Sequence, residues 1–114
     1  MGQLARWLFF GLILLGVAAP SLLRASGPEA AAGKTIFAKK CARCHGKAGE
    51  GKAAIARMFK VEMRHLGAKQ VQAKSDAELR QDITQGTGKM KPVKGLSEAD
   101  QANLVAYIRT LKQK

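Results

Sequence analysis

The chain has 114 residues, of which 20 are basic and 8 acidic, and its formal net charge is +12. A chain of this length forms at most one small domain. The basic balance favours acidic partners or anionic surfaces, but the arginines are not clustered with interleaved aromatic side chains, as nucleic-acid binding would require. We therefore expect no nucleic-acid partner.

Residues 1–27 have the pattern of an export signal. Arg6 and the amino terminus precede Trp7–Ala19, thirteen residues without a charge or a strongly polar side chain, which is the length of a signal-peptide apolar region. A membrane-spanning helix needs about 20 apolar residues. We expect a signal peptide, a mature domain over residues 28–114 and a periplasmic location. The alternative is an uncleaved anchor at the outer face of the cytoplasmic membrane, because the uncharged stretch continues to Arg24.

The mature part, about 88 residues, is marginal for a self-sufficient apolar core. Its aromatic residues are only Phe37, Phe59 and Tyr107, and many of its apolar residues are alanines, which bury little area each. A large, planar, apolar cofactor would fill the interior that these side chains leave open.

The first predicted helix spans residues 29–44. Pro28 stands where a helix can begin, and Ile36 and Phe37 form an apolar stripe. Gly33 lies inside this helix, where glycine costs about 1 kcal/mol relative to alanine. Its position indicates a close contact with another helix.

Residues 41–45 read Cys-Ala-Arg-Cys-His and contain the only two cysteines of the chain. This spacing suits covalent haem attachment, in which each sulfur adds to a vinyl group and the imidazole reaches the iron. Two other readings stay open. A redox-active dithiol would need a βαβ context, and no strong strand pattern appears. A structural zinc site needs four protein ligands, yet only His65 remains as a further nitrogen ligand.

The middle of the chain is predicted to contain short helices. Three glycines within residues 46–51 indicate a turn after the motif, and residues 53–73 are expected to form one or two short helices. Ser75 and Glu78 have the spacing of a capping box. The helix that they start should end at Gly86.

Residues 85–92 form a predicted loop with two glycines and a proline. The last helix follows, with Ser97 as its cap and Asp100 in the box position. One apolar face with helical spacing is made by Leu104, Tyr107, Ile108 and Leu111. The pattern as a whole indicates a single all-α domain without repeats.

A second axial ligand would decide between electron transfer and exchangeable ligand chemistry at a haem iron. Met58 and Met63 lie in an apolar-patterned segment, where methionine usually fills gaps in a core. Met90 lies in the glycine-rich loop and has no evident packing role, so it is the predicted ligand. His65 would give two histidine ligands and a lower potential, but we interpret it as a surface imidazole.

The mature chain resembles the small class I cytochromes c of bacteria over about residues 30–112. Five features match in chain order: the first helix with Gly33 and Phe37, residues 41–46, the capped middle helix, the Gly86-x-Gly88-x-Met90 loop, and Leu104–Arg109 in the last helix. The resemblance implies a bundle of about four to five short helices wrapped around one covalent haem. The N-terminal and C-terminal helices would cross, with Gly33 and Phe37 against Tyr107.

Two departures from the family pattern are evident. The axial methionine is typically followed at once by proline, whereas here Lys91 intervenes before Pro92. The family often has a proline shortly after the haem motif, and its carbonyl orients the histidine ligand. No proline occurs between Gly46 and Lys91. The acceptor of the His45 ring proton is therefore unidentified, although such a partner should exist.

The resemblance implies an electron-transfer protein rather than an enzyme, a monohaem c-type cytochrome acting outside the cytoplasmic membrane. Cys41 and Cys44 would hold haem c, and His45 and Met90 would bind its iron. The expected partners are acidic redox proteins or membrane oxidoreductase complexes, with contact to the membrane itself only if the N-terminal segment is uncleaved. Docking would be guided by Lys40, Lys47, Lys52, Lys89, Lys91 and Lys94.

Three alternatives compete with a free electron carrier. One is a small haem subunit of a dehydrogenase or oxidase complex. Another is a haem protein with an open sixth site for ligand or peroxide chemistry, which would follow if Met90 did not bind the iron. The most remote alternative is a haem-free dithiol oxidoreductase.

Overall fold

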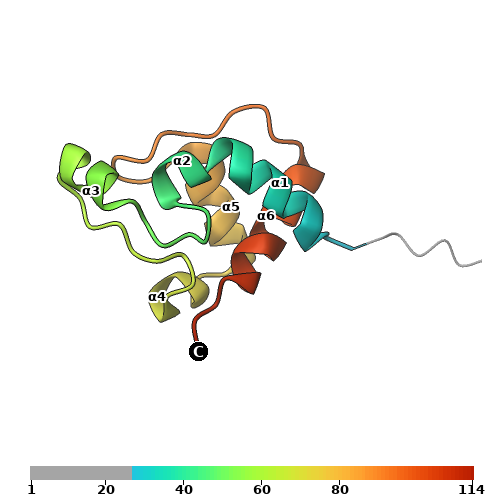
Figure 1. Cartoon of the computed structure of the whole chain (residues 1–114). Coiled ribbons are helices and arrows are strands. Elements are labelled where there is room, and N and C mark those ends of the chain that lie inside the picture. The colour runs from blue at the N-terminus through green and yellow to red at the C-terminus, as the bar shows by residue number, and fades with distance from the viewer. Residues whose placement is uncertain (1–26) are drawn as a thin grey trace, which may run out of the picture.

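The computed structural model of the chain describes residues 27–114 (Figure 1). The expected signal peptide lies outside the described residues, except for Gly27. No helix within the described part is both long and apolar enough to cross a bilayer. Regular structure in this part is helical, apart from one isolated bridge between Thr87 and Met90.

Six helices occur in residues 27–114. They are α1 (Ala30–Lys40), α2 (Ala42–His45), α3 (Ala53–Phe59), α4 (Lys69–Gln72), α5 (Asp76–Gln85) and α6 (Glu98–Thr110). The expected all-α fold is confirmed, although the helices number six rather than four to five. Two of them, α2 and α4, are only four residues long.

The predicted helix over residues 29–44 is wrong near its end, because α1 stops at Lys40 and the helix is interrupted at Cys41. The Cys41 amide still donates to the Phe37 carbonyl at 2.9 Å, but its φ of −118° departs from helical values. Its carbonyl then accepts from the Cys44 and His45 amides, at 3.2 and 2.9 Å. A new turn, α2, therefore begins at the first cysteine of the motif.

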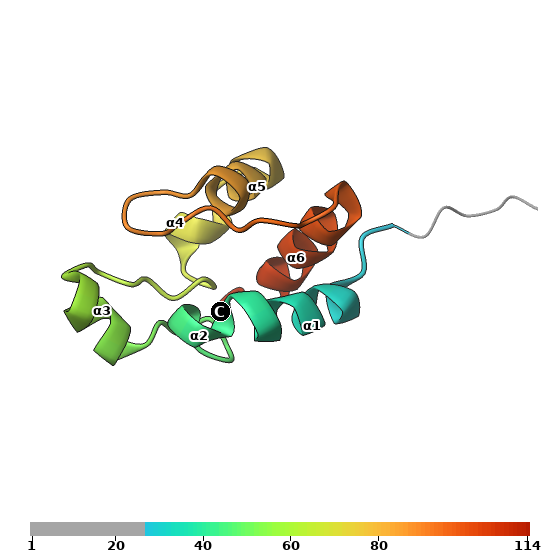
Figure 2. The same ribbon diagram turned by 90° about the horizontal axis from the view of Figure 1, so that it is seen from above.

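Helices α1 and α6 cross closely, as Figure 2 shows. A Cβ placed on Gly33 would lie 1.9 Å from the Asn103 carbonyl oxygen, so the backbones can approach only because residue 33 has no side chain. The Phe37 and Tyr107 rings pack at 5.1 Å between centroids, tilted by 59°. The expected crossing is confirmed.

The buried core comes from three helices, α1, α5 and α6. It consists of Phe37, Leu79, Ile83, Leu104, Val105, Tyr107 and Ile108. Both predicted capping boxes are present, Ser75 with Glu78 on α5 and Ser97 with Asp100 on α6. Gly86 ends α5 with a φ of +78°, as expected.

The irregular segment over residues 60–68 is tied to both ends of the domain. The Leu66 amide donates to the Gly49 carbonyl at 2.8 Å. The Gln72 side-chain amide donates to the carbonyls of Leu66 and Ile108, at 2.9 and 3.0 Å. A Cβ on Gly67 would meet the Leu111 carbonyl at 1.8 Å. The segment is thereby fixed between the turn after α2 and the end of α6.

Candidate functional site

One cavity of about 1190 Å³ occupies the space between α1–α2, α3, α5 and α6. Five of the seven buried core residues line it. The hydrophobic core therefore forms one wall of the cavity and is not closed on that side. These five are Phe37, Leu79, Ile83, Leu104 and Ile108. The cavity exceeds the roughly 300–1,000 Å³ of ordinary ligand pockets. It suits a large, mainly apolar group.

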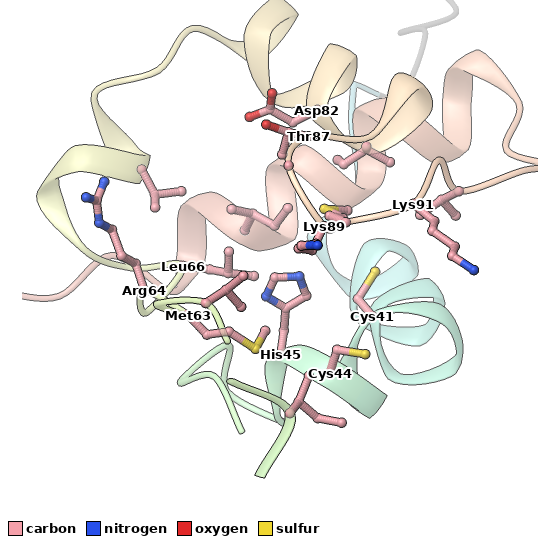
Figure 3. Close-up of a pocket in the computed structure, with 18 of the residues that line it drawn as sticks. Cys41, Cys44, His45, Met63, Arg64, Leu66, Asp82, Thr87, Lys89 and Lys91 are labelled. Atoms are coloured by element: carbon pink, nitrogen blue, oxygen red, sulfur yellow. The ribbon is translucent and has the colours of Figure 1, made fainter. Parts of the chain in front are cut away.

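Cys41, Cys44 and His45 project into this cavity from the corner between α1 and α2 (Figure 3). All three are half-buried, and both thiols are free. Burial lowers the pKa of His45, which favours the neutral imidazole that can bind a metal. The buried His45 Nδ1 atom has no hydrogen-bond partner among the described residues. Two thiols and a neutral imidazole on one wall form the donor set that covalent haem needs.

The environment of Cys41 differs from that of a reactive dithiol. Burial raises the pKa of its thiol to about 11; Lys40 opposes this shift and Cys44 adds to it. Catalytic cysteines instead have a lowered pKa. In addition, residues 27–114 contain no group of three or more His, Cys, Asp or Glu side chains that could hold a metal ion. Both observations weigh against the dithiol and zinc readings.

Three of the four methionines of the chain line the cavity. Met90 is half-buried, and a tight turn holds it, with amide–carbonyl bonds of 2.9 and 3.0 Å to and from Thr87. Met63 is also half-buried. Met58 is 68% exposed, so the expectation that it fills the core is wrong: none of the residues of α3 is buried.

His65 does not line the cavity. It is half-buried, and its Nδ1 atom accepts a hydrogen bond of 2.8 Å from the Gly67 amide. The ring therefore supports the turn into α4, a more specific role than the expected surface imidazole. The competing histidine ligand is not at the site.

The six predicted docking lysines are all exposed. Four of them also line the cavity, and these are Lys40, Lys89, Lys91 and Lys94. The other two, Lys47 and Lys52, are not part of the lining. Sequence reasoning missed an ion pair at the cavity, between Lys74 and Asp82. No local signal marks it, because the eight-residue separation spans the start of α5.

The model of the Cytochrome c family matches residues 30–112. The chain belongs to the cytochrome c family. This cytochrome c is 37% identical over 89 residues to cytochrome c-554(547) of Halothiobacillus neapolitanus, across 74% of this chain and 98% of the relative. Its fold is similar to the solved KustC0563 c-type cytochrome, with a TM-score of 0.61 and 26% identity over 71% of this chain and 98% of that one.

The resemblance to small class I cytochromes c is confirmed, and with it the cofactor. The cofactor of this cytochrome c is covalently bound haem c with its iron, and Cys41 and Cys44 fit its attachment motif. When bound, the haem iron supplies one-electron redox chemistry. The protein is thus a haem-based electron carrier, and its walls provide a cavity into which the thiols and the imidazole project.

Proposed function

We propose that this protein is an exported monohaem cytochrome c that passes single electrons between redox partners outside the cytoplasmic membrane. The supporting observation is the convergence of Cys41, Cys44, His45 and Met90 on one cavity. In this proposal the two cysteines tether the haem, and His45 and Met90 bind its iron. A histidine–methionine pair raises the reduction potential relative to two histidines.

The protein residues have separate tasks in this proposal. The aliphatic wall keeps water from the buried side of the cavity and lowers the local dielectric. Burial keeps His45 neutral, so that its ring nitrogen is available to the iron. The turn between Thr87 and Met90 holds the thioether at the cavity before binding. Transfer of an electron then requires no bond to a substrate and little movement of the chain.

Partner recognition is assigned to the exposed lysines at the cavity. Lys40, Lys89, Lys91 and Lys94 present four positive charges where the cavity meets the solvent. Such a cluster accelerates encounter with an acidic protein and sets its orientation. The complex would be weak and short-lived, as is usual for redox partners. Lys47 and Lys52 would extend the same field at a greater distance from the cavity.

The proposal is tested on protein matured in a host that attaches haem. A pyridine haemochrome assay should give one haem per chain, bound through two thioethers, and the Cys41→Ser/Cys44→Ser variant should give none. Absence of covalent haem from the unmodified chain would contradict the proposal. The oxidised protein should also show a sulfur-to-iron charge-transfer band at the red end of its spectrum and bind no carbon monoxide. Carbon monoxide binding would instead favour an open sixth site.

The proposed location is the periplasm, with attachment to the outer face of the cytoplasmic membrane as the alternative. The support is the charge and apolar pattern of residues 1–27, together with the bacterial c-type cytochrome that this chain resembles. Mass spectrometry of the haem-bearing protein distinguishes the two locations. A chain that begins near residue 28 indicates cleavage and release, whereas an intact N-terminus indicates an anchor.

A further inference from the structure

Lys74 differs in burial from the other basic side chains on the cavity wall. Within residues 27–114, seven lysine and arginine side chains line the cavity, and Lys74 is the half-buried one. The other six are exposed: Lys40, Arg43, Arg64, Lys89, Lys91 and Lys94. Lysine is seldom withdrawn from water unless it is paired with an anion. The burial of Lys74 therefore points to anionic partners at this wall.

The fold holds Lys74 at both its backbone and its side chain. Its carbonyl accepts from the Arg109 guanidinium at 2.6 Å, which ties it to α6. Its Nζ atom pairs with the carboxylate of Asp82 on α5, which is also half-buried and lines the cavity. An ammonium group has three N–H donors. Among the described residues Asp82 takes up one of them, so two donors remain for a further acceptor.

The haem that fits this cavity has one charged edge. Its two propionates are carboxylates on the pyrrole rings opposite those that bear the vinyl groups. Because Cys41 and Cys44 would hold the vinyl groups, the propionates are directed to the side of the cavity far from the cysteines. Figure 2 shows α5 across the molecule from α2, and Figure 3 shows Asp82 across the pocket from Cys44. The Lys74–Asp82 pair therefore lies on the propionate side.

We propose that Lys74 binds a propionate of the haem, and that Asp82 is a positioning residue that holds the ammonium group at the cavity. This inference rests on the proposed attachment of haem through Cys41 and Cys44. Lys74 then lies between two carboxylates, one from α5 and one from the cofactor. A cation shared in this way offsets the repulsion between the carboxylates and favours their ionised forms. The far edge of the haem is thereby fastened to α5, as the cysteines fasten its near edge to α1 and α2.

The other charged groups near this position have partners or lie elsewhere on the lining. Glu62 and Arg64 are exposed and pair with each other at 3.6 Å. Hydrogen bonds from Ser75 lower the pKa of Glu78, and Lys74 adds to this, but that carboxylate belongs to the capping box of α5. The lining from α6 is uncharged. The remaining titratable groups of the lining lie next to the haem motif, within it, or in the Met90 loop: Lys40, Cys41, Arg43, Cys44, His45, Lys89, Lys91 and Lys94.

The test removes one charge at a time from the haem-bearing protein. Lys74→Gln removes the ammonium group, and Asp82→Asn removes the carboxylate charge at nearly constant size. Lys40→Gln is the matched control, because it makes the same change at a cavity-lining lysine beside the cysteines. Two quantities are measured. One is the pH titration of the haem methyl signals by NMR in the oxidised state, which follows propionate ionisation. The other is the midpoint potential as a function of pH.

Lys74→Gln should move the propionate titration upward by about one pH unit or more, because a nearby cation lowers a carboxyl pKa by roughly 1–3. An ionised propionate favours the oxidised iron, so the potential falls as the pH rises through that titration. This fall should move upward together with the NMR titration. At mildly alkaline pH, where the propionates are ionised, loss of the ammonium charge should lower the potential. Loss of the Asp82 charge should raise it.

A purely structural ion pair would give both variants a similar loss of stability and an unmoved propionate titration, and that result would overturn the proposal. An equal upward movement in Lys40→Gln would overturn it as well. If Lys74→Gln does not mature, Asp82→Asn decides alone, because its propionate titration must move downward and its potential must rise. All of these outcomes are read on a haem-bearing protein. Absence of covalent haem from the unmodified chain would instead overturn the proposed function.

Discussion

The two proposed axial residues, His45 and Met90, differ in how the fold prepares them. His45 is the last residue of α2, and the carbonyl at the helix break, that of Cys41, anchors its amide. Met90 is held by a turn that two backbone hydrogen bonds with Thr87 close, in a loop whose neighbouring residues are exposed. The histidine side of the site is thus held by a helix, and the methionine side by a loop. Met90 therefore has the weaker structural support, although its binding to the iron would decide between electron transfer and exchangeable ligand chemistry.

Replacement of Met90 by alanine should remove the thioether and open the sixth position. We expect the charge-transfer band to vanish, the reduction potential to fall and carbon monoxide to bind to the reduced protein. Absorption spectra and a redox titration measure these effects. Met58→Ala provides the control, since Met58 lines the same cavity but is largely exposed. Retention of the band in Met90→Ala would assign the ligand to another residue.

At the scale of elements, the crossing of α1 and α6 depends on one missing side chain. Gly33→Ala places a methyl group into the Asn103 carbonyl, and the two helices must separate to accept it. Overpacking of this kind costs about 1–3 kcal/mol, which exceeds the gain in helix propensity of up to about 1 kcal/mol. We expect a lower free energy of unfolding in a denaturant titration.

The control for this substitution is Lys34→Ala, an exposed position next to Gly33 on the same helix. It should change the free energy of unfolding by no more than about 0.5 kcal/mol. Equal stability of Gly33→Ala and the unmodified protein would show that the crossing has room for a methyl group.

The elements that sequence predicts well are those with local determinants. Both capping boxes join residues three apart, and the stop at Gly86 depends on its own positive φ. The break at Cys41 has no such signature, because residues 30–45 have helix-compatible side chains throughout. The exposure of Met58 was also missed, since an apolar pattern does not reveal which side chains line a cavity and which fill a closed core. Local chemistry thus defines where helices begin and end, and tertiary contacts define which faces are covered.

The candidate site shows the same division. Cys41, Cys44 and His45 are recognisable from spacing alone, and the structure brings Met90 to the same cavity. Met63 could not be placed at the cavity from sequence, because its position depends on a contact with Gly51 across the intervening helix α3. Contacts of this kind between separate segments leave no periodic trace in the sequence.

At the scale of the whole molecule, the core and the cavity share most of their residues. Without covalent haem, as in Cys41→Ser/Cys44→Ser, the wall would face water. We expect weakened helix signals and a broad thermal transition in circular dichroism, because hydrophobic burial is lost on one side of the core. The haem-bearing protein should unfold in one sharp transition. A sharp transition in the haem-free variant would mean that the core is self-sufficient.

The charge distribution predicts salt-dependent electron transfer. Oxidation by the anionic hexacyanoferrate complex, followed by stopped flow, should slow as ionic strength rises. Neutralisation of Lys89, Lys91 and Lys94 to glutamine should slow it by about tenfold at low salt. The control neutralises Lys34, Lys39 and Lys112, which are exposed but do not line the cavity. Equal effects of the two triple variants would assign the rate to net charge rather than to position.

The wall that serves as both core and cavity lining also limits how this protein can evolve. A substitution at Leu79, Ile83 or Leu104 changes the packing of the helices and the surroundings of the haem at once. Selection for a new potential cannot act there without a cost in folding. The loop over residues 86–94 and the segment over residues 60–66 contain none of the fully buried core residues, and only Val93 and Leu66 in them pack against that core. Adaptation to new electron partners should therefore concentrate at the exposed positions of those two segments, while the helical wall and Met90 stay nearly constant.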